Sequence, residues 1–158
     1  MSELSHVDES SGSVQMVDVG HKPPVRRRAV ARGAVLMAPE TARRLRELPK
    51  GDALTTAKLA GIMGAKETSN LIPLCHPLPL DHVDVELEVG EGRVDITASA
   101  EVTARTGVEM EALTAATVAA LCIYDMCKSA DRTMALEQAA LWEKSGGRSG
   151  NFRRPVEP

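Results

Sequence analysis

Apolar and polar residues along the chain follow two different periods, and each predicts one type of secondary structure. Apolar and polar positions alternate strictly over residues 82–89 and again over 93–106, with the turn sequence Gly90-Glu91-Gly92 between them. This alternation predicts a two-stranded hairpin with one face in contact with water. Residues 107–130 carry apolar side chains at three- and four-residue steps without a proline, which predicts a long buried helix.

Further elements are predicted before and after the hairpin and the long helix. Residues 28–37 read as a strand, Pro39 begins a short helix, and Asp52 caps a second helix over residues 53–65. Residues 133–142 supply a last strand. The order β, α(α), β, β, α, β is that of the ferredoxin-like split pattern, an α+β fold with helices on one face of an antiparallel sheet.

The length of the chain predicts one domain with a proper core. We expect a flexible N-terminal tail over residues 1–27, a single catalytic domain over 28–150 and a C-terminal tail over 151–158. Aromatic residues make up only 2 % of the sequence, so Ala, Val, Leu and Met must fill the core, and each buries less area than an aromatic would. Oligomerisation is therefore expected as a supplement to the core.

Charge is distributed unevenly, and this narrows the class of ligand. Nine basic residues fall between Lys22 and Lys50, opposed only by Glu40 and Glu47. A basic segment of this kind can hold phosphates or nucleic acid. Since there are few aromatic side chains to stack on bases, a phosphorylated small molecule fits better than nucleic acid.

The cysteines and the N-terminal sequence indicate the compartment. The three cysteines are an odd number without the spacing of a disulfide scaffold. The N-terminal residues are polar, without an apolar signal core, and we find no uninterrupted apolar run of transmembrane length. We therefore expect a soluble, cytoplasmic protein with no membrane partner.

The segment over residues 66–80 contains three prolines among apolar residues, which predicts a buried, fixed loop. His76, between Cys75 and Pro77, is a candidate for ligand binding, although a lone histidine is more often structural. A metal site built from Cys75-His76 with Cys122 and Cys127 is not expected, because the latter two point about 140° apart on a helix.

Polar side chains on the long helix are not explained by its apolar stripe. Glu111 and Asp125 lie about 40° apart in direction but roughly 21 Å apart along the axis, so one small ligand cannot contact both on a single helix. They belong either to different sites, to sites shared between subunits, or to a solvated face. Asp125 and Lys128 form either a simple ion pair or an aspartate-held lysine for proton transfer. Lys50 is either a well-presented cation in a turn or an ordinary surface lysine.

Several long and unusual motifs stand out in the sequence: LIPLCHPLPL at 71–80, GVEMEALTA at 107–115, AALCIYDMCK at 119–128 and KSGGRSG at 144–150. Together they resemble the cyclic pyranopterin monophosphate synthase family, the MoaC-type enzymes of molybdenum cofactor biosynthesis. MVDV at 16–19 and KGD at 50–52 also resemble that family, so the resemblance covers about residues 4–153.

This resemblance implies a specific activity and assembly. Such enzymes are lyases that convert (8S)-3′,8-cyclo-7,8-dihydroguanosine 5′-triphosphate into cyclic pyranopterin monophosphate and diphosphate. They have a ferredoxin-like fold, assemble as hexamers (trimers of dimers) and place the site at a subunit interface. We expect no cofactor and no metal, because cationic side chains can stabilise the phosphates.

The resemblance also assigns residues to roles. The catalytic residues fall on Asp125, Lys128 and Lys50. The substrate-binding residues fall on Leu74, Cys75, His76, Glu109, Met110, Glu111, Lys144 and Arg148. In our interpretation the two catalytic lysines transfer protons and Asp125 orients Lys128. His76 and Glu111 hold the pterin-forming part, while Lys144 and Arg148 hold the phosphates.

Some positions depart from the family pattern, and other functions stay possible. Asn70 stands where an acid is usual and Arg148 where lysine is common, and the run Arg26-Arg27-Arg28 leaves open which residue matches the family's early arginine. The main alternative is a non-catalytic nucleotide-binding regulatory module or an inactive paralogue. An RNA-binding domain is a weaker alternative, because the hairpin carries no aromatic residues.

Overall fold

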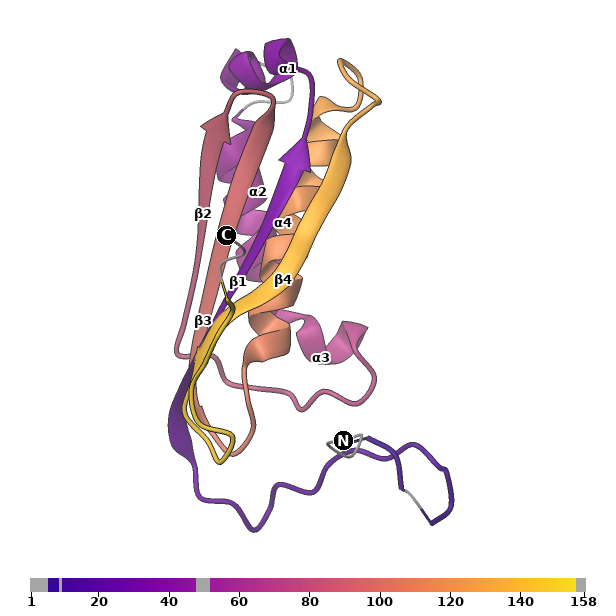
Figure 1. Ribbon diagram of the computed structural model, residues 1–158, viewed down its shortest axis with the longest axis vertical. Coiled ribbons are helices and arrows are strands. Elements are labelled where there is room, and N and C mark those ends of the chain that lie inside the picture. Colours follow the sequence, from indigo (N-terminus) through magenta and orange to yellow (C-terminus); the bar gives the residue numbers. More distant parts are fainter. Residues whose placement is uncertain (1–5, 9, 48–51, 156–158) are drawn as a thin grey trace.

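The structure, a computed structural model, describes residues 6–8, 10–47 and 52–155 and centres on a five-stranded antiparallel sheet (Figure 1). The strands lie in the order β2-β3-β1-β4-β5. Their bounds are β1 Val25–Leu36, β2 His82–Gly90, β3 Arg93–Ala104, β4 Ala135–Ser145 and β5 Phe152–Arg153. The helices are α1 Pro39–Arg43, the 3-10 helix η1 Leu45–Glu47, α2 Ala53–Lys66, α3 Thr68–Leu71 and α4 Glu109–Cys127. The α+β class and the predicted order of the main elements are confirmed.

Helices α2 and α4 lie side by side on one face of the sheet and bury its alternate residues (Figure 1). On β3 every second side chain from Val94 to Val102 is buried, while the side chains between them are half-buried on the other face. The alternation predicted for the hairpin thus decides which face of the sheet meets the helices. We call the opposite face, which none of the described helices covers, the open face.

The contact between α2 and α4 depends on small residues. A Cβ atom at Gly64 would lie 2.8 Å from Cγ2 of Val118, and one at Gly61 would lie 2.9 Å from the carbonyl oxygen of Ala115. Both distances are too short for a side chain, so only glycine permits this approach of the two backbones. No aromatic side chain among the described residues is fully buried, and a core of small side chains packs densely when its helices lie close together.

The two ends of the helix layer carry different segments. At one end, which we call the α3 end, β1 begins, β3 stops and α4 starts, since Val25 pairs with Ala104. At the other end, which we call the α1 end, α4 stops and β4 starts. The amide of Ala38, just before α1, donates a hydrogen bond there to Asp131, which lies between α4 and β4. Helix α4 therefore connects the two ends (Figure 1).

Some predicted boundaries and one burial prediction are corrected by the structure. Strand β1 begins at Val25 instead of residue 28, and β4 extends to Ser145, so it includes Lys144. The short strand β5, which pairs with β4, was not predicted, since two residues are too few to show a period. Residues 66–80 are not a buried loop: they contain α3, and Leu71 is 58 % exposed.

Helix α4 is, among the described residues, the one helix whose length and composition would allow it to cross a membrane. More than half of that segment is buried against the sheet and α2. The core helix of a soluble protein passes the same test, so this observation is weak support for a membrane span.

Candidate active site

At the α3 end, Lys144 of β4 reaches across the edge of the helix layer to the start of α4. Its Nζ lies 3.0 Å from Oε1 of Glu109 and donates a hydrogen bond of 2.7 Å to Oγ of Ser149. Gly107 makes this possible, because a Cβ there would clash with the Glu109 carboxylate. The lysine and the glutamate are both largely shielded from water, with side chains 22 % and 28 % exposed, so their charges interact more strongly than on an open surface.

Two residues after Glu109, in the same first turn of α4, Glu111 is buried at 4 % exposure. Burial raises the pKa of this carboxyl to about 7, and the negative charge of Glu109 contributes in the same direction. The Cys75 thiol lies close enough that its pKa, raised chiefly by burial, is raised further by the Glu111 charge. The structure therefore brings the 72–80 segment and the start of α4 together, as expected for a shared site.

The raised pKa of Glu111 predicts a stability that falls as pH rises. Between pH 4.5 and about 7 the folded protein keeps this carboxyl protonated while the unfolded chain ionises it. Stability is therefore full below the unfolded pKa and declines as pH rises through the folded pKa, by up to about 3 kcal/mol. Thermal unfolding between pH 5 and 8 should show this loss in the wild type and a flatter profile in Glu111→Gln. Glu86→Gln, on exposed β2, should keep the wild-type slope, and equal slopes in all the proteins would contradict the assignment.

The other residues predicted to contact substrate also lie at the α3 end, with different degrees of exposure. Leu74 and His76 are half-buried in the segment between α3 and β2. Met110 is 37 % exposed in the first turn of α4, and Arg148 is exposed in the loop after β4. All four side chains are thus at least partly accessible to a ligand.

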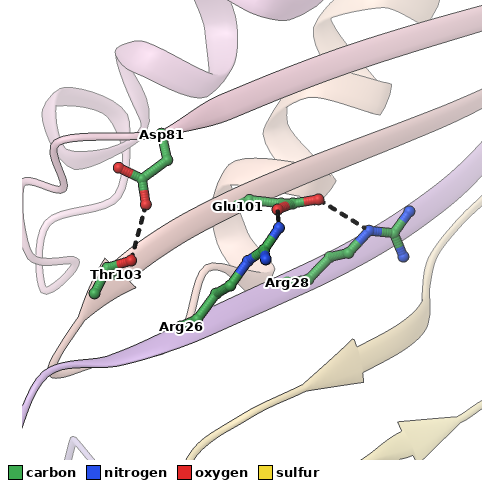
Figure 2. Close-up of polar contacts among 5 residues, drawn as sticks. All are labelled: Arg26, Arg28, Asp81, Glu101 and Thr103. Atoms are coloured by element: carbon green, nitrogen blue, oxygen red, sulfur yellow. Dashed lines mark hydrogen bonds and ion pairs between the residues drawn. The ribbon is translucent and has the colours of Figure 1, made fainter.

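The structure separates the three arginines that the sequence left equivalent. Arg26 and Arg28 lie on the open face, where Glu101 accepts a hydrogen bond of 2.7 Å from Arg26 and lies 3.4 Å from Nε of Arg28 (Figure 2). The pKa of Glu101 is lowered first by Arg26 and also by the charge of Arg28. Both arginines thus share one carboxylate on the face away from the helices, and Asp81 and Thr103 form a separate contact beside them (Figure 2).

Arg27 instead shares the helix-covered face with Ala29 and Ala31, because side chains alternate along β1. Its Nε and Nη2 donate hydrogen bonds of 3.1 and 3.2 Å to the carbonyl oxygens of Ala104 and Arg105. A Cβ at Gly147 would clash with Arg27 Nη1, so the glycine loop lies directly against this guanidinium. Arg27 and Lys144 therefore present two cations at the α3 end.

At the α1 end, Asp125 and Lys128 form the ion pair predicted from their spacing. Nζ of Lys128 lies 2.6 Å from Oδ1 of Asp125, and both side chains are more than half exposed. Lys50, the third predicted catalytic residue, lies outside the described residues. The pair therefore sits on the surface near the end of α4, accessible to a ligand or to another subunit.

Asp131, close to this pair, was not singled out in the sequence. It is 8 % exposed, and its pKa is lowered first by the Ala38 amide and then by Thr133 and Thr41. The sequence shows only that the apolar pattern of the long helix ends at this residue. A buried aspartate that holds backbone amides and an ordinary exposed polar residue both end such a pattern.

The two groups of predicted residues do not meet within one chain. Glu111 and Asp125 are fourteen positions apart on α4, roughly 21 Å at the helical rise. A cavity of about 1000 Å³ lies elsewhere, on the open face between Arg32, Trp142 and Arg154, and none of the described site residues lines it. Among the described residues, no three His, Cys, Asp or Glu side chains are grouped as metal ligands.

Comparison with known proteins identifies the family of this chain. Residues 16–147 match the MoaC family. The chain is 57 % identical over 156 residues to the cyclic pyranopterin monophosphate synthase of Roseiflexus sp. (strain RS-1), covering 96 % of this chain and 98 % of that protein. It is 54 % identical to the protein of the same name from Thermomicrobium roseum, covering 98 % of this chain and 95 % of the relative. It also matches 47 % of a molybdenum cofactor biosynthesis bifunctional protein from Chlorobaculum tepidum, at 53 % identity over 93 % of this chain.

The fold defines an α+β protein whose antiparallel sheet is covered on one face by helices, with acids and cations grouped at the α3 end. With matches of this length and identity, the chain belongs to the MoaC family.

Proposed function

We propose that this chain is a cyclic pyranopterin monophosphate synthase of molybdenum cofactor biosynthesis, a lyase that releases diphosphate from (8S)-3′,8-cyclo-7,8-dihydroguanosine 5′-triphosphate. The α3 end carries the proposal, because it combines two presented cations with a buried carboxyl that titrates near neutral pH. The name of relatives more than 50 % identical over nearly the whole chain supports the same activity.

The cations at the α3 end suit the phosphate chemistry. Closing the cyclic phosphate requires a ribose oxygen to attack the α-phosphorus while the bond to the diphosphate oxygen breaks. The hydroxyl proton passes to a base, and negative charge develops on the departing diphosphate. Lys144, Arg27 and Arg148 are positioned to stabilise that charge through charge-assisted hydrogen bonds, and Ser149 already holds the Lys144 ammonium.

The rearrangement of the purine into a pterin needs several proton transfers, and acid–base groups occur at both ends of α4. Glu111, with a pKa of about 7, can give or take a proton at neutral pH. His76 holds the pterin-forming part beside it. Lys128, oriented by Asp125 at 2.6 Å, and Lys50 carry out the other transfers.

We further propose a ferredoxin-like subunit that assembles into a hexamer of three dimers. The strand order β2-β3-β1-β4, with α2 and α4 on one face, supports the subunit fold. The outer surface of the helix layer exposes apolar side chains, with Leu59 57 %, Met63 65 % and Leu121 53 % exposed, which favours burial against another copy. A two-fold axis can bring the α1 end of one subunit to the α3 end of its partner and so complete the site.

The activity is tested by incubating the purified protein with the cyclised guanosine triphosphate intermediate. Diphosphate release together with a pterin that becomes fluorescent on oxidation would support the proposal. Binding without diphosphate release would refute it and favour a nucleotide-binding module or an inactive paralogue.

The position of Arg27 predicts which arginine contacts the substrate. Arg27→Ala should lower kcat/KM by about 10- to 100-fold, because a charged hydrogen bond to phosphate contributes about 1.5–3 kcal/mol. Arg28→Ala, one position away but on the open face, should stay within about twofold of wild type, as expected for an exposed ion pair. Steady-state kinetics of both variants decides between them, and a larger loss for Arg28→Ala would reverse the assignment.

A further inference from the structure

Asp131 stands at a junction between the end of α4 and two other segments. Its Oδ2 accepts a hydrogen bond of 2.8 Å from the amide of Ala38, which precedes α1. Its Oδ1 accepts bonds of 2.8 and 2.7 Å from the amide and hydroxyl of Thr133, just before β4. A single buried carboxylate thus fixes the β1–α1 junction to the α4–β4 junction.

The backbone between Cys127 and Asp131 forms a tight turn that carries Lys128. The amides of Ala130 and Asp131 both donate to the carbonyl oxygen of Cys127, at 2.8 and 3.0 Å. Cys127 and Asp131 are buried, whereas the three residues between them are exposed. The position of the Lys128 backbone is therefore set by one anchor in the core and one at Asp131.

We propose that Asp131 is a positioning residue for the Asp125–Lys128 pair, holding the turn that carries Lys128 in place for proton transfer. The inference rests on the function proposed above. Lys128 is the C-cap residue of α4, and its amide donates to Tyr124 at 2.9 Å, so the turn continues the helix on which Asp125 lies. Loosening the Asp131 anchor lets the lysine move relative to the helix, and a displacement of about 1 Å can cost about 100-fold in rate.

Asp131→Asn tests this directly, because asparagine keeps the size of the side chain but places an NH₂ group where one carboxylate oxygen accepts. Where the new NH₂ group faces the backbone N–H of Ala38 or Thr133, two donors oppose each other and the hydrogen bond to that N–H is lost. We expect kcat to fall about 10-fold, and about 100-fold in Asp131→Ala, with KM within about twofold of wild type, since the phosphate-binding residues lie at the other end of α4. Glu101→Gln, which changes a carboxylate on the open face, should leave both constants unchanged (Figure 2).

Two further readouts separate positioning from a general loss of stability. In a double-mutant cycle with Asp125→Asn, the losses in kcat should be less than multiplicative, because both changes disturb the same pair. Amide hydrogen exchange, measured well below the Tm, should accelerate in residues 125–134 of Asp131→Asn and stay unchanged in the sheet.

An unchanged kcat in folded Asp131→Asn, fully multiplicative losses, or exchange raised evenly throughout the chain would each overturn the inference. A wild-type protein without turnover would refute the proposed function instead. The exchange experiment would then decide alone whether Asp131 holds the Lys128 turn.

Discussion

Replacing Lys128 by alanine is expected to abolish product formation, with a loss of at least about 10³-fold in kcat, while the protein stays folded. The magnitude follows from the proposed role of Lys128, which combines proton transfer with positive charge, each contributing on the order of 10²-fold or more. The fold should survive, because Lys128 is more than half exposed and its one described ion pair, with Asp125, is a surface contact of little stabilising effect. Diphosphate release and the Tm measure the two effects separately.

Lys58 provides a matched control for this substitution. It forms a comparable ion pair, with its Nζ 2.8 Å from Oδ1 of Asp84 on the edge strand β2, and neither residue belongs to the predicted site. Lys58→Ala should retain the wild-type rate within about twofold, as surface ion pairs usually allow. Substantial turnover in Lys128→Ala would remove the lysine from the catalytic group, whatever the control shows.

Activity should return when two inactive variants, Lys128→Ala and Lys144→Ala, are denatured, mixed and refolded together. If each site takes the α1 end of one subunit and the α3 end of its partner, a mixed dimer contains one site with both changes and one site with neither. Random pairing in equal amounts should then restore about a quarter of the wild-type activity. The physical reason is the separation along α4, which prevents one copy from supplying a complete site.

The matching negative control mixes variants from the same end. Lys128→Ala with Asp125→Ala should stay inactive, because every site in a mixed dimer then carries one damaged α1 end. No recovery in the first pair would mean that each site is built from a single chain, and recovery in this pair would mean that Lys128 and Asp125 of one site come from different subunits.

The sequence was sufficient for the elements whose side chains follow a clear period. Alternation over residues 82–106 identified both strands of the hairpin, and the apolar stripe identified α4 with its ends moved inward by a few residues. It was not sufficient for Leu71: apolar composition suggested burial, whereas this side chain is left exposed at the end of α3. Composition does not reveal whether a surface faces the subunit's own core or another subunit.

For the site, spacing identified the Asp125–Lys128 pair but did not distinguish the three arginines. Side chains alternate between the two faces of β1, so Arg27 faces the helices only if Ala29, and not Val30, also faces them. Ala29 and Val30 are both apolar, so the sequence does not show which of them faces the helices. The role of Asp131 depends on Ala38, a partner 93 positions away, and no local pattern can report such a contact.

The arrangement of α4 restricts which changes of chain length the protein can accept. One residue inserted between Glu111 and Asp125 would turn everything beyond it by about 100° and shift it by about 1.5 Å. Helices α2 and α4 pack too closely at Gly61 and Gly64 to accommodate such a rotation and shift. Substitutions on the outer surface of α4 can accumulate one by one, whereas a single added or deleted codon in this stretch would misplace all the residues at one end of α4 relative to those at the other.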